Sequence, residues 1–286
     1  MIVGYVFALV AALASGGGSV LESIGVRRAG AYGGSALDLV RLRRQWIYFL
    51  GIGVDLVGFA CAAAALHRLP LFLVQSVLAF SIGVTAAISA FLGSRLTAPG
   101  WTALGIGAIG LVLLGLSAQP GPAKALPEVW RWVLPAMALV VGAIAWYFRR
   151  FDRPWAAQVL GFATGVGFSV VGVSARTLNL PSSGWGMLVE PAVWAMILNG
   201  LAAAVAFALA LQKGGATAVN AIMFTTNTAL SSVIGLVFLD DRVRDGFTAF
   251  TITGLILAMA GAIVTAHYAT QAKEPLHVAQ QSRVLR

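Results

Sequence analysis

One acidic residue, Asp55, lies in the middle of an apolar run from 45 to 66. An ionised carboxylate at the centre of a bilayer costs at least about 2.5–3.5 kcal/mol, so an acid at this position is expensive to keep. Gly51, Gly58 and Ala62 share its helical face, and small residues let helices approach closely. We therefore expect Asp55 to point into a helix bundle. There it would bind a cation or a proton, or else tie two helices together as a hydrogen-bonded carboxylate.

Polar residues recur at helical spacing in a later apolar run. Asn220, Asn227 and Ser231 are seven and four residues apart, so they share one helix face. An earlier run has a thinner polar face that includes Gln75. Polar faces on two helices fit a substrate cavity between them. Interhelical hydrogen bonds, worth about 0.6 kcal/mol each, are the alternative explanation.

Glu22 is a further acid, close to the end of the first apolar run, on the same face as Ser15 and Ser19. Two interpretations stay open for it. Its side chain extends toward Arg27 and Arg28 at the membrane interface, as long side chains near helix ends do. Alternatively, it provides a second acid at the mouth of a pathway.

Residues for enzymatic chemistry do not cluster. His67, His267 and His277 lie at the ends of apolar runs or in the tail, and the single cysteine, Cys61, has no partner for a disulfide within the chain. No nucleophile, base and orienting group share a workable spacing. We therefore expect a protein that is not an enzyme and that holds no resident cofactor.

The composition of the chain indicates the class of protein. Of 286 residues, 59% are hydrophobic and 10% charged, and the mean hydropathy is +0.88. Soluble domains average roughly 45–50% apolar and about 25% charged residues. This excludes a cytosolic enzyme, a disordered chain and a nucleic-acid-binding domain. The chain is expected to be an all-α integral membrane protein, because a backbone in lipid must satisfy its own hydrogen bonds.

Nine apolar runs are long enough to span a bilayer, since about 20 helical residues cross about 30 Å of hydrocarbon. Proline or glycine marks several of the connections between them. The expected spans are 3–25, 45–66, 70–92, 99–118, 129–148, 154–177, 188–211, 217–238 and 246–268.

Basic residues predict the orientation of these spans. The net charge of +9 comes mainly from short loops, which is the positive-inside pattern and not a sign of a nucleic-acid partner. With nine spans the two termini lie on opposite sides. Six of the 19 Lys and Arg residues lie on the side of the N-terminus, and the others lie on the side that should be cytoplasmic. We expect an inner (plasma) membrane protein with its N-terminus outside. The six are Arg68, Lys124, Arg131, Arg176, Arg242 and Arg244.

An internal repeat relates the two halves of the chain. The segment 100–103 reads Gly-Trp-Thr-Ala and 246–249 reads Gly-Phe-Thr-Ala, 146 residues later. At a shift of 145, Gln75 falls on Asn220. Spans 1–4 thus match spans 6–9, and because each matches a helix five spans later, the halves must be inverted. Inverted repeats are typical of secondary transporters, whose substrate sites lie between the halves near the midplane.

The repeat divides the chain into four parts. The first repeat covers 1–125, a connecting fifth span 126–150, the inverted second repeat 151–269, and a polar cytoplasmic tail 270–286. At the position of Asp55 the second half has Gly200, with Asn199 beside it, so Asn199 joins the candidate site.

The residues also resemble a known family. Ala65-Leu66-His67-Arg68-Leu69-Pro70 in the first half corresponds to Ala210-Leu211-Gln212-Lys213-Gly214-Gly215 in the second. This arrangement resembles the drug/metabolite transporter superfamily, including its EamA-like members. Nine spans, with Gly53-Val54-Asp55 before Phe59, are similar to its NIPA-like magnesium-transporter branch, which has Glu for the Asp. Ser94 and Asp240-Asp241 stand where the superfamily usually has a Glu.

The resemblance implies a secondary transporter of a small cation or metabolite. Mg²⁺ is the substrate implied, with Asp55 as its ligand, and Mg²⁺ or H⁺ would be a transported or coupling ion. The expected partners are the lipid bilayer and a small-molecule or cation substrate, with no nucleic acid; a homodimer stays open. The alternative function is a non-transporting membrane subunit or scaffold in a cell-envelope complex.

Overall fold

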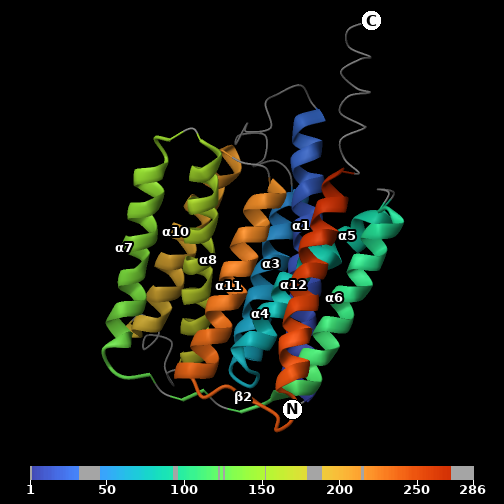
Figure 1. Ribbon diagram of the computed structural model, residues 1–286. Helices are drawn as coiled ribbons and strands as arrows, with labels where there is room; N and C mark the ends of the chain where they lie inside the picture. Colours follow the sequence, from blue (N-terminus) through green and yellow to red (C-terminus); the bar gives the residue numbers. More distant parts are fainter. Residues whose placement is uncertain are drawn as a thin grey trace, which may run out of the picture.

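The computed structural model describes residues 2–31, 46–92, 96–121, 123–124, 126–151, 153–178, 189–213 and 216–271. Within these, the side chains at 22–23, 25–31, 154, 216–217 and 269–271 are not described. In the described part of the chain nine helical spans are long and apolar enough to cross a membrane (Figure 1). The expectation of an all-α multi-pass membrane protein is confirmed.

The helices begin and end close to the expected residues. Their ends lie within three residues of the predicted spans, except that the first helix continues to Ala31. Proline lies in the first turn of α6 and α8, where its missing N–H has no helical partner to lose. The helices are α1 (Ile2–Ala31), α3 (Trp46–Leu66), α4 (Leu71–Ala79), α5 (Ser81–Phe91), α6 (Ala98–Ser117), α7 (Trp130–Phe148), α8 (Pro154–Thr177), α10 (Pro191–Lys213), α11 (Ala216–Phe238) and α12 (Thr248–Gln271).

The third span is two helices, α4 and α5, and not the continuous one expected over 70–92. The break lies at Phe80, where the Gly83 N–H donates to the Phe80 carbonyl at 2.8 Å in a tight i→i+3 turn. The Phe80 ring lies against Gly83 and Gly107, which have no side chains to displace it. The length of an apolar run predicts a span, but it does not show where the helix within the span is interrupted. The break at Phe80 therefore could not be predicted from the sequence.

Helices pack in close pairs built on glycine. In the first half α1 lies along α3, and a Cβ added at Gly18 would lie 2.9 Å from the Gly51 carbonyl oxygen. In the second half α8 lies along α10, where a Cβ at Gly167 would lie 2.8 Å from the Ala203 Cβ. Such close approach requires residues without side chains.

The last helices of the two halves, α6 and α12, pack directly on each other. A Cβ added at Gly110 would lie 2.7 Å from the Gly254 carbonyl oxygen, and one at Gly261 would lie 2.8 Å from that of Ala103. Numbers rise along α6 as they fall along α12, so the two helices are antiparallel. This direction agrees with an inverted repeat, while superposition of the halves about an axis in the membrane plane stays a prediction.

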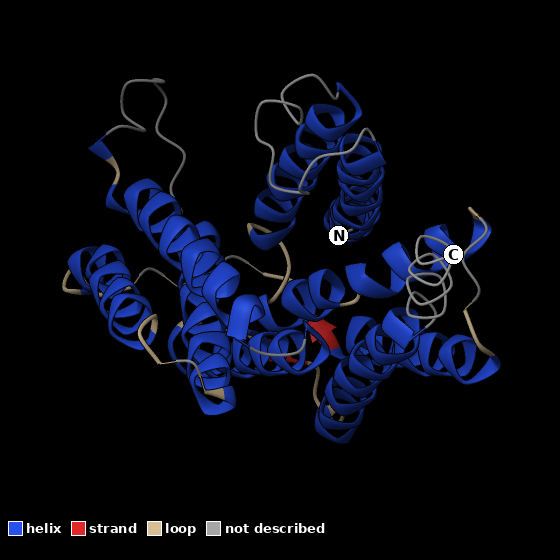
Figure 2. Ribbon diagram, turned by 90° about the horizontal axis from the view of Figure 1, so that it is seen from above, coloured by secondary structure: helices blue, strands red, loops and turns tan. Residues whose placement is uncertain are grey.

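An apolar cluster of buried residues surrounds α4. Leu71, Phe72, Leu73 and Val74 are all buried in one apolar cluster. Beside it lies a short antiparallel pair of strands, β1 (Ala118–Gln119) and β2 (Arg242–Val243), drawn in red near the centre of Figure 2. The strands join the segment after α6 to the segment after α11, so the two halves are tied together at this end.

Candidate substrate cavity

A cavity of about 1120 Å³ lies between the α1–α3 pair and the rest of the bundle. Its walls come from α3, α4, α5, α8, α10 and α11, with contributions from α1 and α12, so helices from both halves line it. Its polar lining residues are Ser15, Ser19, Asp55, Gln75, Ser81, Thr85, Ser89, Asn220 and Asn227.

Asp55 lies in the wall of this cavity, and it is exposed and not buried among the helices. The position follows from the packing of α3, because a Cβ added at Gly18 of α1 would lie 3.3 Å from the Asp55 Cβ. Gly58, one turn further, contacts α1 in the same way. Among the described residues that line the cavity, Asp55 is the one acidic or basic residue.

Two amides in the cavity wall join the halves directly. Asn227 on α11 donates from Nδ2 to Oε1 of Gln75 on α4 at 3.1 Å. Ser231 extends the chain, since its hydroxyl lies 3.4 Å from Oδ1 of Asn227 and 3.1 Å from the Ser169 hydroxyl. Gly172 leaves room for the Gln75 amide, because an added Cβ would collide with its nitrogen. Gln75, Asn227 and Ser231 therefore lie together in the structure.

The other predicted site residues have different places. Asn220 lines the cavity, whereas Ser231 reaches it only through Asn227. The Glu22 side chain lies outside the described residues.

Asn199 does not line the cavity, contrary to the expectation that it belongs to the site. It is buried, and its Nδ2 donates to the carbonyls of Leu134 on α7 and Ala195, at 2.9 Å each. Successive residues on a helix are rotated by about 100° around its axis. Gly200 therefore lines the cavity, while the adjacent Asn199 faces α7 and ties α10 to it.

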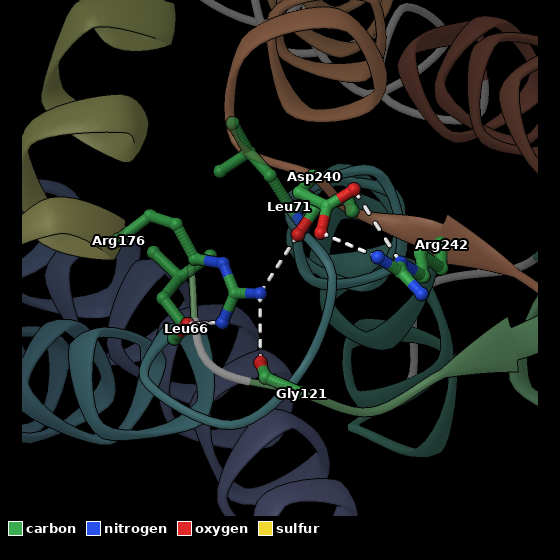
Figure 3. Close-up of polar contacts among 7 residues, drawn as sticks. Leu66, Leu71, Gly121, Arg176, Asp240 and Arg242 are labelled. Atoms are coloured by element: carbon green, nitrogen blue, oxygen red, sulfur yellow. Dashed lines mark hydrogen bonds and ion pairs between the residues drawn. The ribbon is translucent and has the colours of Figure 1, made fainter. Parts of the chain in front are cut away.

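A buried ion pair lies where the cavity meets the apolar cluster around α4. Arg176, in the last turn of α8, donates from Nη2 to Asp241 Oδ1 at 2.7 Å. It also donates to the carbonyls of Leu66 and, at 2.9 Å, Gly121 (Figure 3). The other Asp241 oxygen accepts the Leu71 N–H at 2.6 Å, at the start of α4.

This ion pair was not predicted. The available signals were a basic residue in the last turn of a span and the Asp240-Asp241 pair after another. Nothing in the sequence shows that they meet, because 65 residues separate them. Asp240 pairs instead with Arg242 in an exposed contact of 2.9 Å. The hydrogen bond from Arg242 lowers the pKa of the Asp240 carboxyl.

His67 lies in the turn between α3 and α4, beside this ion pair. Partial burial lowers the pKa of its imidazole, and the nearby Arg176 charge lowers it further. His67 is therefore held toward its neutral form by the surroundings of the ion pair.

Comparison with known proteins gives one relative over most of the length. The chain is 29% identical over 283 residues to an Arabidopsis thaliana protein named "Probable magnesium transporter NIPA3". The match covers 90% of this chain and 76% of the relative. No family model matches the chain. No solved structure matches it significantly either.

Proposed function

We propose that this protein is a secondary transporter of the drug/metabolite type that moves a small cation or metabolite by alternating access. The observation that carries the proposal is the position of Asp55 in a cavity lined by helices of both halves. Transporters built from inverted repeats place their substrate sites at such an interface. The similarity to a protein named as a magnesium transporter supports a transport function.

Asp55 would bind the transported cation or a coupling proton. A carboxylate within a span is costly, and an acid that lines a cavity between helices is a functional candidate by default. The Gln75–Asn227 amide pair would form a polar part of the cavity wall and hold the two halves in register.

The two ends of the cavity differ in a way that supports alternating access. At one end Leu66 and Ala175 are buried near the Arg176–Asp241 pair. At the other end Ser89 and Leu96 are only half-buried. In the predicted orientation the closed end is extracellular. Transport would then require the ion pair, or the helices that it joins, to separate at another stage of the cycle.

Mg²⁺ is the specific ion that the relative's name favours. It would reach Asp55 as substrate, and it would keep much of its hydration shell, because Mg²⁺ dehydrates reluctantly. The membrane would be the inner (plasma) membrane, with the N-terminus outside and the C-terminus in the cytoplasm.

Uptake into proteoliposomes tests the proposal. The substrates would be Mg²⁺ and a panel of labelled organic cations and neutral metabolites, assayed with and without a pH gradient. We expect uptake of at least one substrate by the wild type and none, or uptake that no longer responds to pH, by Asp55→Asn. Asp245→Asn makes the same change at an exposed acid outside the spans and should transport normally.

Two results would count against the proposal. If the reconstituted wild type transports nothing in the panel, the transporter function is wrong and the alternative function as a membrane scaffold is favoured. If Asp55→Asn transports at the wild-type rate with an unchanged pH profile, Asp55 is a structural residue only.

A further inference from the structure

We propose that the turn between α7 and α8 binds the headgroup of an anionic phospholipid, with the acyl chains along the exposed face of α7. The site lies at the ends of two spans, and none of its described residues lines the cavity between the halves. Three features carry it: arginines stacked on aromatic rings, an uncompensated positive charge and an apolar face that leads to the arginines.

Two arginines at the end of α7 are stacked on aromatic side chains. The Arg150 guanidinium carbon lies 4.3 Å from the centre of the Tyr147 ring. That of Arg149 lies 5.4 Å from the centre of the Trp146 ring. Arg150 Nε also donates to the Tyr147 carbonyl at 3.0 Å, which fixes the orientation of the guanidinium. Both arginines are exposed, so their outer N–H groups are free to bind a phosphate through two parallel hydrogen bonds.

A cluster of aromatic side chains holds this turn in place. The Phe151 ring packs against those of Tyr147 and Trp155, with ring centres 5.5 Å apart in each pair. The Phe148 ring lies 5.6 Å from that of Trp155, so rings from α7, from the turn and from α8 all meet. Aromatic rings of this kind are enriched at the headgroup level of membranes. The cluster therefore positions the arginines at the depth where lipid phosphates lie.

The charge of this surface is positive. The segment 149–153 contains three arginines and one acid, Asp152, which lies outside the described residues. No ion pair joins the three arginines to a carboxylate in the part of the chain that the structure describes. Lys213, at the end of α10, adds a further charge at the same end of the bundle, where α7, α8 and α10 share an apolar cluster (Figure 1).

An exposed apolar face of α7 leads directly to the arginines. Leu139, Ala143 and Trp146 are spaced by four and three residues, and Arg150 follows four residues later, so the four share one helix face. All four are exposed. The face is about 16 Å long at about 1.5 Å per residue, which is about half of a hydrocarbon core of about 30 Å. An acyl chain of one leaflet would lie along this face while its headgroup meets the arginines.

A lipid with two phosphates fits this surface best. The arginines and Lys213 supply more positive charge than a single phosphate diester balances. Basic sites between spans bind headgroups such as that of cardiolipin, which carries two phosphates. The positive-inside pattern accounts for basic residues in this turn, but not for their stacking on aromatic rings beside an exposed apolar face.

Mixed-micelle titrations of the delipidated full-length protein with labelled lipids test the proposal. The probes are cardiolipin, phosphatidylglycerol and the zwitterionic phosphatidylcholine. We expect cardiolipin to bind at least about tenfold more tightly than phosphatidylcholine, because each basic residue near an anionic lipid contributes about fivefold. Binding of cardiolipin should weaken as the ionic strength rises, since exposed charges are screened. Equal binding of the three lipids, or cardiolipin binding that does not respond to salt, would overturn the assignment.

A matched pair of double variants tests the arginines. Arg149→Gln with Arg150→Gln should weaken cardiolipin binding by at least about tenfold. Arg242→Gln with Arg244→Gln changes two exposed arginines near the opposite end of the bundle, where Arg244 also lies over an aromatic ring, at 5.6 Å. This control should bind cardiolipin like the wild type. An equal loss in the two double variants would show that only net charge matters and that the α7–α8 turn is not a site.

A second matched pair tests the aromatic support. Trp146 and Trp132 are both exposed on α7, near its opposite ends. Trp146→Leu removes the ring beneath Arg149, so cardiolipin binding should fall a few-fold, whereas Trp132→Leu should bind like the wild type. Unchanged binding by Trp146→Leu would count against the stacked geometry. Because all the substituted side chains are exposed, the lipid-free melting temperatures of these variants should equal that of the wild type.

Inorganic pyrophosphate distinguishes a lipid from a free anion. It carries two phosphates but no acyl chains to bury on α7, so an equimolar amount should not displace cardiolipin. Displacement would show that the surface recognises free phosphate and that the lipid assignment is wrong. None of these measurements involves transport or Asp55, so their failure would leave the proposed function standing.

Discussion

Arg176 donates to Asp241 across 2.7 Å, and both side chains are buried. The pair joins the end of α8 to the segment after α11, and through Leu66 and Leu71 it also holds the turn between α3 and α4. Arg176 Nε is buried without a hydrogen-bond partner, so the guanidinium is not fully satisfied. The ion pair therefore organises four segments, and its net contribution to stability must be measured.

Loss of one partner should be far more costly than loss of an exposed ion pair. Arg176→Met leaves the Asp241 charge buried and unpaired, and we expect a loss of about 3–5 kcal/mol in the free energy of unfolding. Arg242→Met, at the neighbouring exposed pair, should leave the melting temperature nearly unchanged. Melting temperatures in detergent, with a double-mutant cycle to Asp241→Asn, measure the coupling. Strictly additive effects of the two substitutions would contradict a direct interaction.

His67 should make stability decrease in acid. Its imidazole has an ordinary pKa near 6.5, which burial and then Arg176 lower in the folded protein. Between the two pKa values the unfolded chain binds a proton that the folded one does not, so stability falls as the pH drops below about 6.5 and levels off below the folded pKa. The melting temperature of the wild type should fall more between pH 7 and 5 than that of His67→Gln. Parallel pH profiles for the two proteins would exclude this contribution.

Glycine at the α6–α12 contact should tolerate no side chain. In Gly110→Ala the new methyl group would meet the Gly254 carbonyl oxygen, and we expect a loss of about 1–3 kcal/mol as the helices separate. Gly105→Ala, on the same helix, would meet no atom within 4 Å and should be neutral or stabilising. Thermal unfolding of both variants makes the comparison. If they melt at the same temperature, the contact is looser than the structure indicates.

A second carboxylate should change the ion that the cavity accepts. Gly200 lines the cavity, and a Cβ added there would be 3.9 Å from its nearest neighbour, Val171, so a side chain has room. With Asp55 and a new acid in one cavity, Gly200→Asp should bind Mg²⁺ at least about tenfold more tightly than the wild type, because two carboxylates balance its charge. Gly200→Asn is the control of equal size, and calorimetry measures the affinities. A gain in Gly200→Asn as large as that in Gly200→Asp would show that charge is not the cause.

Thiol labelling tests the predicted orientation. The segment from Val26 to Arg44 carries five arginines and one aspartate, Asp38, and should be cytoplasmic. In a Cys61→Ala background, Ser35→Cys should resist an impermeant thiol reagent in intact cells and react after permeabilisation. Asp245→Cys, on the opposite side in this orientation, should react in intact cells. The reverse pattern would invert the topology.

The spans could be predicted from the sequence because the length of an apolar helix is set by the thickness of the bilayer. Helical spacing also indicated that Asn220 and Asn227 share one face of their helix, since a face is a local property of one helix, and both residues line the cavity. Contacts between segments far apart in the sequence could not be predicted. The meeting of Arg176 with Asp241 and the tie from Asn199 to α7 depend on how whole helices pack.

The hydrogen bond from Leu71 to Asp241 bears on how the chain is made. It joins residues that are 170 positions apart. At about 5–20 residues per second, the ribosome adds Asp241 about ten to thirty seconds after Leu71. Throughout that interval the amide at the start of α4, a largely buried helix, lacks its final acceptor. Nascent chains that have not yet reached Asp241 should therefore hold this region in an unfinished form, open to quality-control proteases and insertion chaperones.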